Sequence, residues 1–153
     1  MSLHLSRYSF IGDQLRYFFY KKSINKVGKG VKFSFGVVFS HKNIEIGDNV
    51  RFGPYNTVGL VDFGDNVLIG QYVNFLSGKN QHYFNSIDTP INQQTGVQER
   101  ITIGNDCWIG AGSTLMCNIG KKSVIGAGTI VVKPIDNYSI VVGNPGKVIR
   151  SRI

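Results

Sequence analysis

The residues of this chain that could carry acid–base or metal chemistry are few and widely spaced. They are the histidines His4, His41 and His82 and the cysteines Cys107 and Cys117. The histidines lie too far apart in sequence to form a zinc motif with the cysteines, so no metal is expected. Two cysteines are also too few for a disulfide framework, which favours a reducing compartment, the cytoplasm. His82 differs from the others because it lies in a break of an otherwise regular pattern.

The regular pattern is a large apolar residue followed by glycine, and within each set it recurs every six residues. The pairs are Ile46-Gly47, Phe52-Gly53, Val58-Gly59, Phe63-Gly64, Ile69-Gly70, Ile103-Gly104, Ile109-Gly110, Ile119-Gly120 and Ile125-Gly126. A period of six fits neither an α-helix nor an alternating strand, and short hexapeptide repeats are typical of a parallel β-helix. With 153 residues, of which 42% are hydrophobic, the chain is predicted to be one all-β domain of this kind.

Each hexad is expected to form a short strand and a turn, with its large apolar side chain pointing into the core. The following glycine permits a crowded backbone at the corner. Small or β-branched residues occupy the fifth position of the hexads and are expected to fill the corners of the core: Val50, Val67, Val73, Cys107, Ser113, Ser123 and Thr129. Cys107 is therefore predicted to be a packing residue and not a reactive thiol.

The repeat is interrupted in residues 77–100. Between Phe75 and the next in-phase residue, Ile103, about twenty-two residues bulge out of one coil. A loop of this length inside a compact repeat is usually functional or disordered. Its apolar residues predict that it packs against other parts of the protein: Tyr83, Phe84, Ile87, Pro90 and Ile91. An imidazole has a pKa near neutrality, so His82 in this loop could take a proton from a reacting group.

The net charge of +8 is concentrated at the two ends of the chain. Residues 1–32 contain seven Lys or Arg against Asp13, and residues 147–153 add three more basic residues. Such ends favour anionic partners, such as phosphates or an anionic membrane surface. A soluble protein with basic termini is the simpler alternative, and no nucleic-acid partner is expected.

The segment before the repeat, SFIGDQLRYFFYKK, predicts a short amphipathic helix. Residues 1–26 are expected to cap the open end of the β-helix, because a solenoid must cover its terminal coil. The alternative is that this helix docks on a membrane surface with help from Lys21 and Lys22.

Residues 101–150 contain IGNDCWIGAGSTL and IGKKSVIGAGTIVVKPIDNYSIVVGNPGKVIR, which resemble the hexapeptide-repeat acyltransferases. The similarity is closest to the sugar O-acetyltransferases, namely the maltose and galactoside group and the capsule and lipopolysaccharide enzymes. It implies a left-handed parallel β-helix over residues 27–153, with a short N-terminal helix, the protruding loop 77–100 and a basic tail at 143–153. The left hand comes from the resemblance alone, because the general rule for β-crossovers favours the opposite hand.

The resemblance also implies an acetyl-CoA-dependent O-acetyltransferase that acts on a hydroxyl of a sugar or polysaccharide precursor. Enzymes of this family need no metal, and their active sites lie between the subunits of a homotrimer. The cytoplasm, or the inner face of the membrane, would suit this activity. Two alternatives are a xenobiotic (antibiotic) acetyltransferase, which has a similar repeat, and a non-catalytic β-helix scaffold.

Within the resemblance, His82 in NQHYFNSIDTPI matches the histidine that serves as general base at the start of the loop. Trp108 in DCWIG matches a tryptophan beside that histidine; its alternative role is packing at the trimer interface. Asn74, just before the loop, is a candidate to hydrogen-bond the acceptor or the histidine. Asp62 lies near where the galactoside group places a sugar-binding aspartate, and Tyr83 suits a carbohydrate.

The resemblance implies a donor site as well. Ala111 and Ala127 are small residues of successive coils that correspond to contacts with the pantetheine arm of acetyl-CoA. The tail GNPGKVIRSRI matches the terminal motif of the family, whose basic residues, here Lys147 and Arg150, meet the CoA phosphates. Lys133, at a coil edge, is a further candidate for the donor site.

Overall fold

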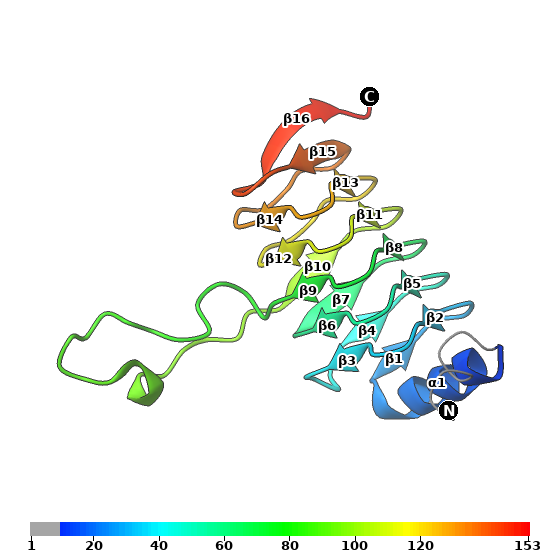
Figure 1. Ribbon diagram of the computed structural model, residues 1–153, viewed down its shortest axis with the longest axis horizontal. Coiled ribbons are helices and arrows are strands. Elements are labelled where there is room, and N and C mark those ends of the chain that lie inside the picture. Colours follow the sequence, from blue (N-terminus) through cyan, green and yellow to red (C-terminus); the bar gives the residue numbers. More distant parts are fainter. Residues whose placement is uncertain (1–9) are drawn as a thin grey trace, which may run out of the picture.

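The structure is a computed structural model that describes residues 10–153 as a parallel β-solenoid with one helix at its N-terminal end (Figure 1). His4 and the rest of residues 1–9 lie outside the described part. Short strands stack from coil to coil into three sheets, here called A, B and C, which form the three faces of the solenoid. The prediction of an all-β parallel β-helix with a short N-terminal helix and a protruding loop is confirmed.

The strands of each sheet come from successive coils. Sheet A contains β1 (Lys26–Val27), β4 (Glu45–Ile46), β7 (Val61–Phe63) and β10 (Ile101–Ile103). Sheet B contains β2 (Lys32–Phe33), β5 (Arg51–Phe52), β8 (Leu68–Ile69), β11 (Trp108–Ile109), β13 (Val124–Ile125), β15 (Ser139–Val142) and β16 (Lys147–Ser151). Sheet C contains β3 (Val38–Phe39), β6 (Thr57–Val58), β9 (Asn74–Phe75), β12 (Thr114–Leu115) and β14 (Ile130–Val131). The last strand, β16, folds back and pairs antiparallel with β15 at the end of sheet B.

The core is built from the inward-facing residues of the repeat. Large apolar side chains stack in register, as Phe33 does on Phe52 with ring centroids 5.3 Å apart. The predicted corner residues are all buried: Val50, Val67, Val73, Cys107, Ser113, Ser123 and Thr129. The hydroxyl of Ser113 donates to the carbonyl oxygen of Gly110 at 2.7 Å, which satisfies this polar corner residue inside the core. The prediction that Cys107 fills a corner is therefore confirmed.

The glycines of the repeat are required by the close approach of neighbouring coils. A Cβ atom added to Gly110 would lie 2.4 Å from the backbone nitrogen of Ala127 in the next coil. A Cβ atom on Gly70 would likewise lie 2.6 Å from the nitrogen of Ala111. Because such distances are far below van der Waals contact, any larger residue would push the coils apart, as the sequence pattern predicted.

The helix α1 (Phe10–Ser23) covers the open edge of the first coil, and it does so with polar groups. Tyr17 and Tyr20 donate from their hydroxyls to the carbonyl oxygens of Gly28 and Val37, and Arg16 donates from Nε to Phe33. These carbonyls belong to a terminal coil that has no further strand to accept from, so they need side-chain donors. The large apolar residues of the helix consequently face outward. No helix within residues 10–153 is long and apolar enough to cross a membrane.

Candidate active site

The interruption of the repeat forms an arm, residues 76–100, that leaves the solenoid between sheets C and A and projects away from it (Figure 1). Its two sides run antiparallel and are joined by backbone hydrogen bonds. Glu99 donates to Ser77 at 2.9 Å, Val97 to Asn80 at 2.8 Å and Tyr83 to Thr95 at 3.2 Å. The arm is therefore an ordered ribbon with a short 3₁₀ helix, η1 (Ile91–Gln93), near its tip.

The tip of the arm is held by polar contacts and not by its apolar residues. The side-chain amide of Gln94 donates to the carbonyl oxygens of Ser86 and Thr89, both at 2.8 Å. Large apolar side chains of the arm are exposed: Phe84 at 74%, Ile87 at 97% and Ile91 at 59%. The sequence predicted that these residues pack, yet within the described part of this chain they have little to pack against. Exposed apolar side chains of this size mark a surface that contacts something.

The root of the arm is anchored to sheet A by Arg100. Its guanidinium donates from Nη1 to Oδ1 of Asp62 at 2.7 Å and from Nη2 to the carbonyl oxygen of Asn43 at 2.9 Å. The same Asp62 oxygen also accepts from the backbone nitrogen of Glu45 at 2.8 Å. The contacts given for Asp62 thus hold the arm to sheet A, and its predicted sugar-binding role stays a prediction.

His82 lies in the part of the arm near the solenoid, and its side chain is exposed. Its backbone is pressed against Gly96 on the opposite side of the arm, where an added Cβ would lie 2.5 Å from the His82 nitrogen. Tyr83 follows in the arm, and Asn74 faces outward on β9 immediately before it, so these three predicted residues belong to one side of the molecule.

Trp108 occupies a different face. Its indole lies on the outer surface of sheet B, in register with Leu68 on one side and Val124 on the other. These side chains line an open hollow of about 700 Å³, and Arg150 and Arg152 line it as well. Arg150 reaches the hollow because β16 folds back and places it opposite Ile140 of β15. The structure thus brings Trp108 together with Arg150, a proximity that the sequence did not predict.

Of the residues that line this hollow, only Trp108 and Arg150 were predicted as site residues. The sequence reasoning missed the others, Leu68, Val124, Ile140 and Arg152 among them. A signal was present, because the residue before each inward-facing position of sheet B points outward. In the first coils this position holds Lys32 and Arg51, and from Leu68 onward it is apolar: Leu68, Trp108, Val124 and Ile140. An outward-facing apolar row on a sheet indicates a surface that contacts something.

The other predicted donor residues lie at two corners. Ala111 and Ala127 follow one another on successive coils between sheets B and C, where the backbone nitrogen of Gly128 donates to Ala111 at 2.8 Å. Beside them, Cβ atoms added to Gly112 and Gly128 would meet nothing within 4 Å, so this corner is an open track. Lys147 is exposed at the start of β16, and the preceding Gly146 lies against Thr129 and Ile130, next to this corner. Lys133 is exposed at the opposite corner, between sheets C and A.

The predicted residues are therefore divided among separate faces of one chain. His82, Tyr83 and Asn74 belong to the arm and sheet C, whereas Trp108 and Arg150 lie on sheet B. Figure 1 shows the arm on the side of the solenoid away from β8, β11 and β13. Because side chains on different faces of a rigid solenoid cannot meet one small ligand, a site containing both His82 and Trp108 requires two chains.

The two cysteines are shielded groups. Burial raises the pKa of the Cys107 thiol, whose Sγ lies 3.2 Å from the carbonyl oxygen of Gly120. Burial also raises the pKa of the half-buried Cys117, near the root of the arm. Among the described residues, no three His, Cys, Asp or Glu side chains gather in a way that could hold a metal ion.

Comparison with known proteins agrees with this architecture. The family "Hexapeptide repeat of succinyl-transferase" matches residues 100–133. A probable acetyltransferase of Mycobacterium tuberculosis is 30% identical over 150 residues, which cover 82% of this chain and 49% of that protein. A galactoside O-acetyltransferase of Lactococcus lactis is 32% identical over 137 residues, covering 82% of this chain and 62% of that enzyme.

Among solved structures, a galactoside acetyltransferase in complex with coenzyme A is similar over 97% of this chain and 76% of that one, with a TM-score of 0.81 and 28% identity. The chain spans between 26% and 62% of the length of the first curated relatives that it matches. The resemblance to hexapeptide-repeat acetyltransferases, including the left hand of the coil, is confirmed. The chain is thus a hexapeptide-repeat, left-handed β-helix protein whose relatives in sequence and in fold are acetyltransferases.

Proposed function

We propose that this protein is an acetyl-CoA-dependent O-acetyltransferase that acts on a hydroxyl of a sugar or saccharide, with active sites between the subunits of a homotrimer. The observation that carries the proposal is the match, over nearly the whole chain, to a galactoside acetyltransferase solved with coenzyme A. The division of the candidate residues between two faces supports sites shared by two chains. The exposed apolar side chains of the arm support the same arrangement, because a neighbouring subunit would cover them.

In this proposal His82 is the general base. Its imidazole takes the proton of the acceptor hydroxyl as that oxygen attacks the thioester carbonyl of acetyl-CoA. The C–O bond forms and the carbonyl oxygen becomes an oxyanion, which needs hydrogen-bond donors. The indole N–H of Trp108 from a neighbouring chain, or backbone N–H groups of the arm, would supply them. Collapse of the intermediate breaks the C–S bond, and the imidazolium returns the proton to the departing thiolate of CoA.

The donor would lie along the corner between sheets B and C. The open track beside Ala111 and Ala127 has the small side chains that a thin pantetheine arm requires. Lys147 and Arg150 would meet the CoA phosphates through charge-assisted hydrogen bonds. Lys133, at the other corner of the same chain, could join this site only from a neighbouring subunit.

The acceptor side would be formed by the arm. Tyr83 and Asn74 lie on the same side of the molecule as His82, and both can donate and accept hydrogen bonds with hydroxyl groups. An aromatic ring beside polar amides suits a sugar, which offers an apolar ring face and several hydroxyls.

Calorimetric titration tests the donor part of the proposal without knowledge of the acceptor. One molecule of acetyl-CoA is expected to bind per chain. The same ligand lacking its 3′-phosphate is expected to bind more weakly. A folded oligomer that binds neither ligand would contradict the proposal and favour a non-catalytic scaffold. Once binding is found, a panel of sugars beside a hydroxyl-bearing antibiotic, with free thiol as the readout, identifies the acceptor class.

A further inference from the structure

One surface of the molecule takes no part in the proposed reaction and is unusually apolar: the outer face of α1. Four large side chains lie on it, with exposed fractions of 70% for Ile11, 66% for Leu15, 60% for Phe18 and 64% for Phe19. Their spacing places them on one stripe of the helix. A stripe of this size on a protein surface marks a place where something apolar binds.

The cap does not explain this stripe. The opposite side of α1 covers the first coil with Tyr17, Tyr20 and Arg16, whose polar ends satisfy the carbonyls of that coil. Tyr20 also packs its ring on Phe33 and Phe39 of the core, with centroids 4.6 and 5.0 Å apart. The helix would therefore cap the solenoid equally well with polar residues on its outer face.

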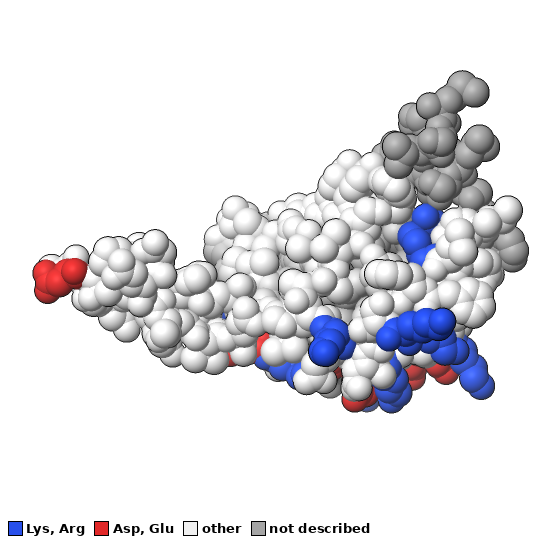
Figure 2. Space-filling model, turned by 90° about the horizontal axis from the view of Figure 1, so that it is seen from below, with Lys and Arg blue, Asp and Glu red and all other residues white. Residues whose placement is uncertain are grey.

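Basic residues surround the stripe. Lys21 and Lys22 are exposed in the last turn of α1, and Lys29 and Lys32 are exposed on the adjoining coil. Figure 2 looks onto this end of the molecule and shows Lys and Arg side chains, with some Asp and Glu among them, along one edge of a wide surface without charged residues. Residues 10–32 hold six basic residues against Asp13 alone, and that carboxylate is already paired with Arg16.

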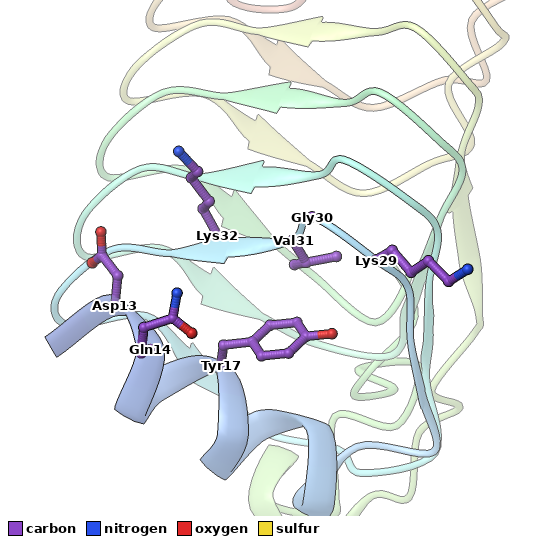
Figure 3. A pocket seen from close by; sticks show the side chains of 7 residues that line it. All are labelled: Asp13, Gln14, Tyr17, Lys29, Gly30, Val31 and Lys32. Carbon is purple, nitrogen blue, oxygen red and sulfur yellow. The ribbon is translucent and has the colours of Figure 1, made fainter. Parts of the chain in front are cut away.

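A small pocket lies at the flank of the stripe, between α1 and the first coil. It measures about 310 Å³ and is lined by Gln14 and Tyr17 of the helix and by Lys29 and Lys32 of the coil, among others. Figure 3 shows both lysines on the first coil, with their amino ends pointing in different directions and away from the helix. These two lysines add positive charge at this end of the molecule to that of Lys21 and Lys22 in α1 itself.

We infer that α1 is a membrane-docking helix that lies in the plane of an anionic lipid surface. Its apolar stripe would enter the boundary between headgroups and acyl chains, while the surrounding lysines meet the lipid phosphates. A second copy of this chain is a poorer occupant, because two such faces would bring like charges together. The inference is independent of the proposed acetyl transfer and stands on the helix and its charges.

Vesicle flotation with the full chain tests the inference. The protein is expected to float with vesicles of phosphatidylcholine and phosphatidylglycerol, and much less with phosphatidylcholine alone. The double substitution Leu15→Ser with Phe18→Ser should weaken binding at least about tenfold. Lys21→Glu with Lys22→Glu should do the same by removing attraction to the anionic lipid. Because the amino group of Lys21 lies 5.4 Å from the centroid of the Tyr17 ring, Lys22→Glu alone is included as a second charge variant. The circular dichroism spectrum and melting temperature of every variant are measured beside its vesicle binding.

Matched substitutions elsewhere provide the controls. Val148→Ser with Ile149→Ser removes two exposed apolar side chains from β16, at the other end of the solenoid. Lys121→Glu with Lys122→Glu reverses an exposed lysine pair at a corner. Both controls should bind vesicles like the unaltered protein. The inference is overturned if the unaltered protein does not float with anionic vesicles, or if the α1 variants float as well as the controls. Concentration-dependent self-association that only the Leu15/Phe18 variant loses, without vesicle binding, would assign the stripe to a second copy instead.

Discussion

Arg100 and Asp62 tie the end of the arm to the solenoid through a 2.7 Å ion pair that is about two-thirds shielded from solvent on both sides. The guanidinium also holds the carbonyl of Asn43, so one side chain joins the arm to two coils of sheet A. Arg100, at the root of the arm, therefore fixes where the arm leaves the solenoid, although it lies well after His82 in the sequence.

Replacing Arg100 by Ala should lower the free energy of unfolding by about 1 kcal/mol, because a partly exposed ion pair and one hydrogen bond are lost. Asp62→Asn is the matched change, since an amide oxygen can still accept from Glu45 while the ion pair is weakened. Chemical denaturation measures the stability, and hydrogen exchange of residues 76–100 measures the order of the arm. Unaltered exchange in both variants would show that the pair does not anchor the arm.

His82→Ala should lower turnover by a factor of about 10²–10⁴ while leaving the Kd for acetyl-CoA unchanged, because a general base acts on the acceptor and not on the donor. His41→Ala is the control, since this half-buried histidine lies in the corner that joins β3 to β4 and is not part of the arm. Steady-state rates of thiol release and calorimetric affinities, measured side by side, separate the two effects. Normal turnover by the His82 variant would remove it from the catalytic role.

Arg150→Ala should raise the Kd for acetyl-CoA by about tenfold or more, because a charge-assisted contact to phosphate is lost. The same substitution should change the Kd for the ligand without the 3′-phosphate much less if Arg150 meets that group. Arg51→Ala is a matched control, since Arg51 also faces outward on sheet B but lies two strands from Trp108. Equal effects of the two substitutions would argue against a phosphate contact by Arg150.

The cysteines provide a pH-dependent test of the core. Burial raises the pKa of Cys107, so in the folded protein its thiol keeps its proton to higher pH than in the unfolded chain. This contribution to stability is complete below the unfolded pKa and is lost as the pH rises through the folded value. Because the thiolate is the reactive form, alkylation of Cys107 should be slow in the native protein and should accelerate towards alkaline pH.

Iodoacetamide labelling followed by mass spectrometry, in buffer and in denaturant, measures this difference. The variant Cys117→Ser isolates the signal of Cys107, and Cys107→Ser isolates that of the less buried Cys117. Equal labelling rates of Cys107 in the native and unfolded states at neutral pH would show that its corner of the core is open.

The hexad pattern was enough to predict the parallel β-helix. Each large apolar residue fills the core, and each glycine allows the next coil to approach closely. The same pattern did not predict which side of α1 faces the solenoid. The open coil presents carbonyl oxygens that only hydrogen-bond donors satisfy, and apolar periodicity carries no information about these acceptors. Tyr17 and Tyr20 supply these donors, so their side of the helix faces the coil.

Individual residues of the candidate site could be predicted from the sequence, but which of them lie close together could not. The loop and His82 follow from the broken repeat, yet the sequence joined Trp108 to His82 and the structure joins it to Arg150. That proximity depends on the return of β16 along β15, which no periodicity in the sequence predicts. The spacing of residues also does not predict that His82 and Trp108 lie on different faces, because this depends on the triangular path of each coil.

Mixing of variant subunits tests whether one active site is shared by two chains. His82→Ala and Trp108→Ala are each expected to be nearly inactive. When both variants are unfolded together and refolded as mixed oligomers, some interfaces regain an intact His82 from one chain and an intact Trp108 from the next. The mixture should then reach about a quarter of the unaltered rate, the fraction of head-to-tail interfaces with that composition. A mixture no more active than the average of the two variants would contradict the shared site.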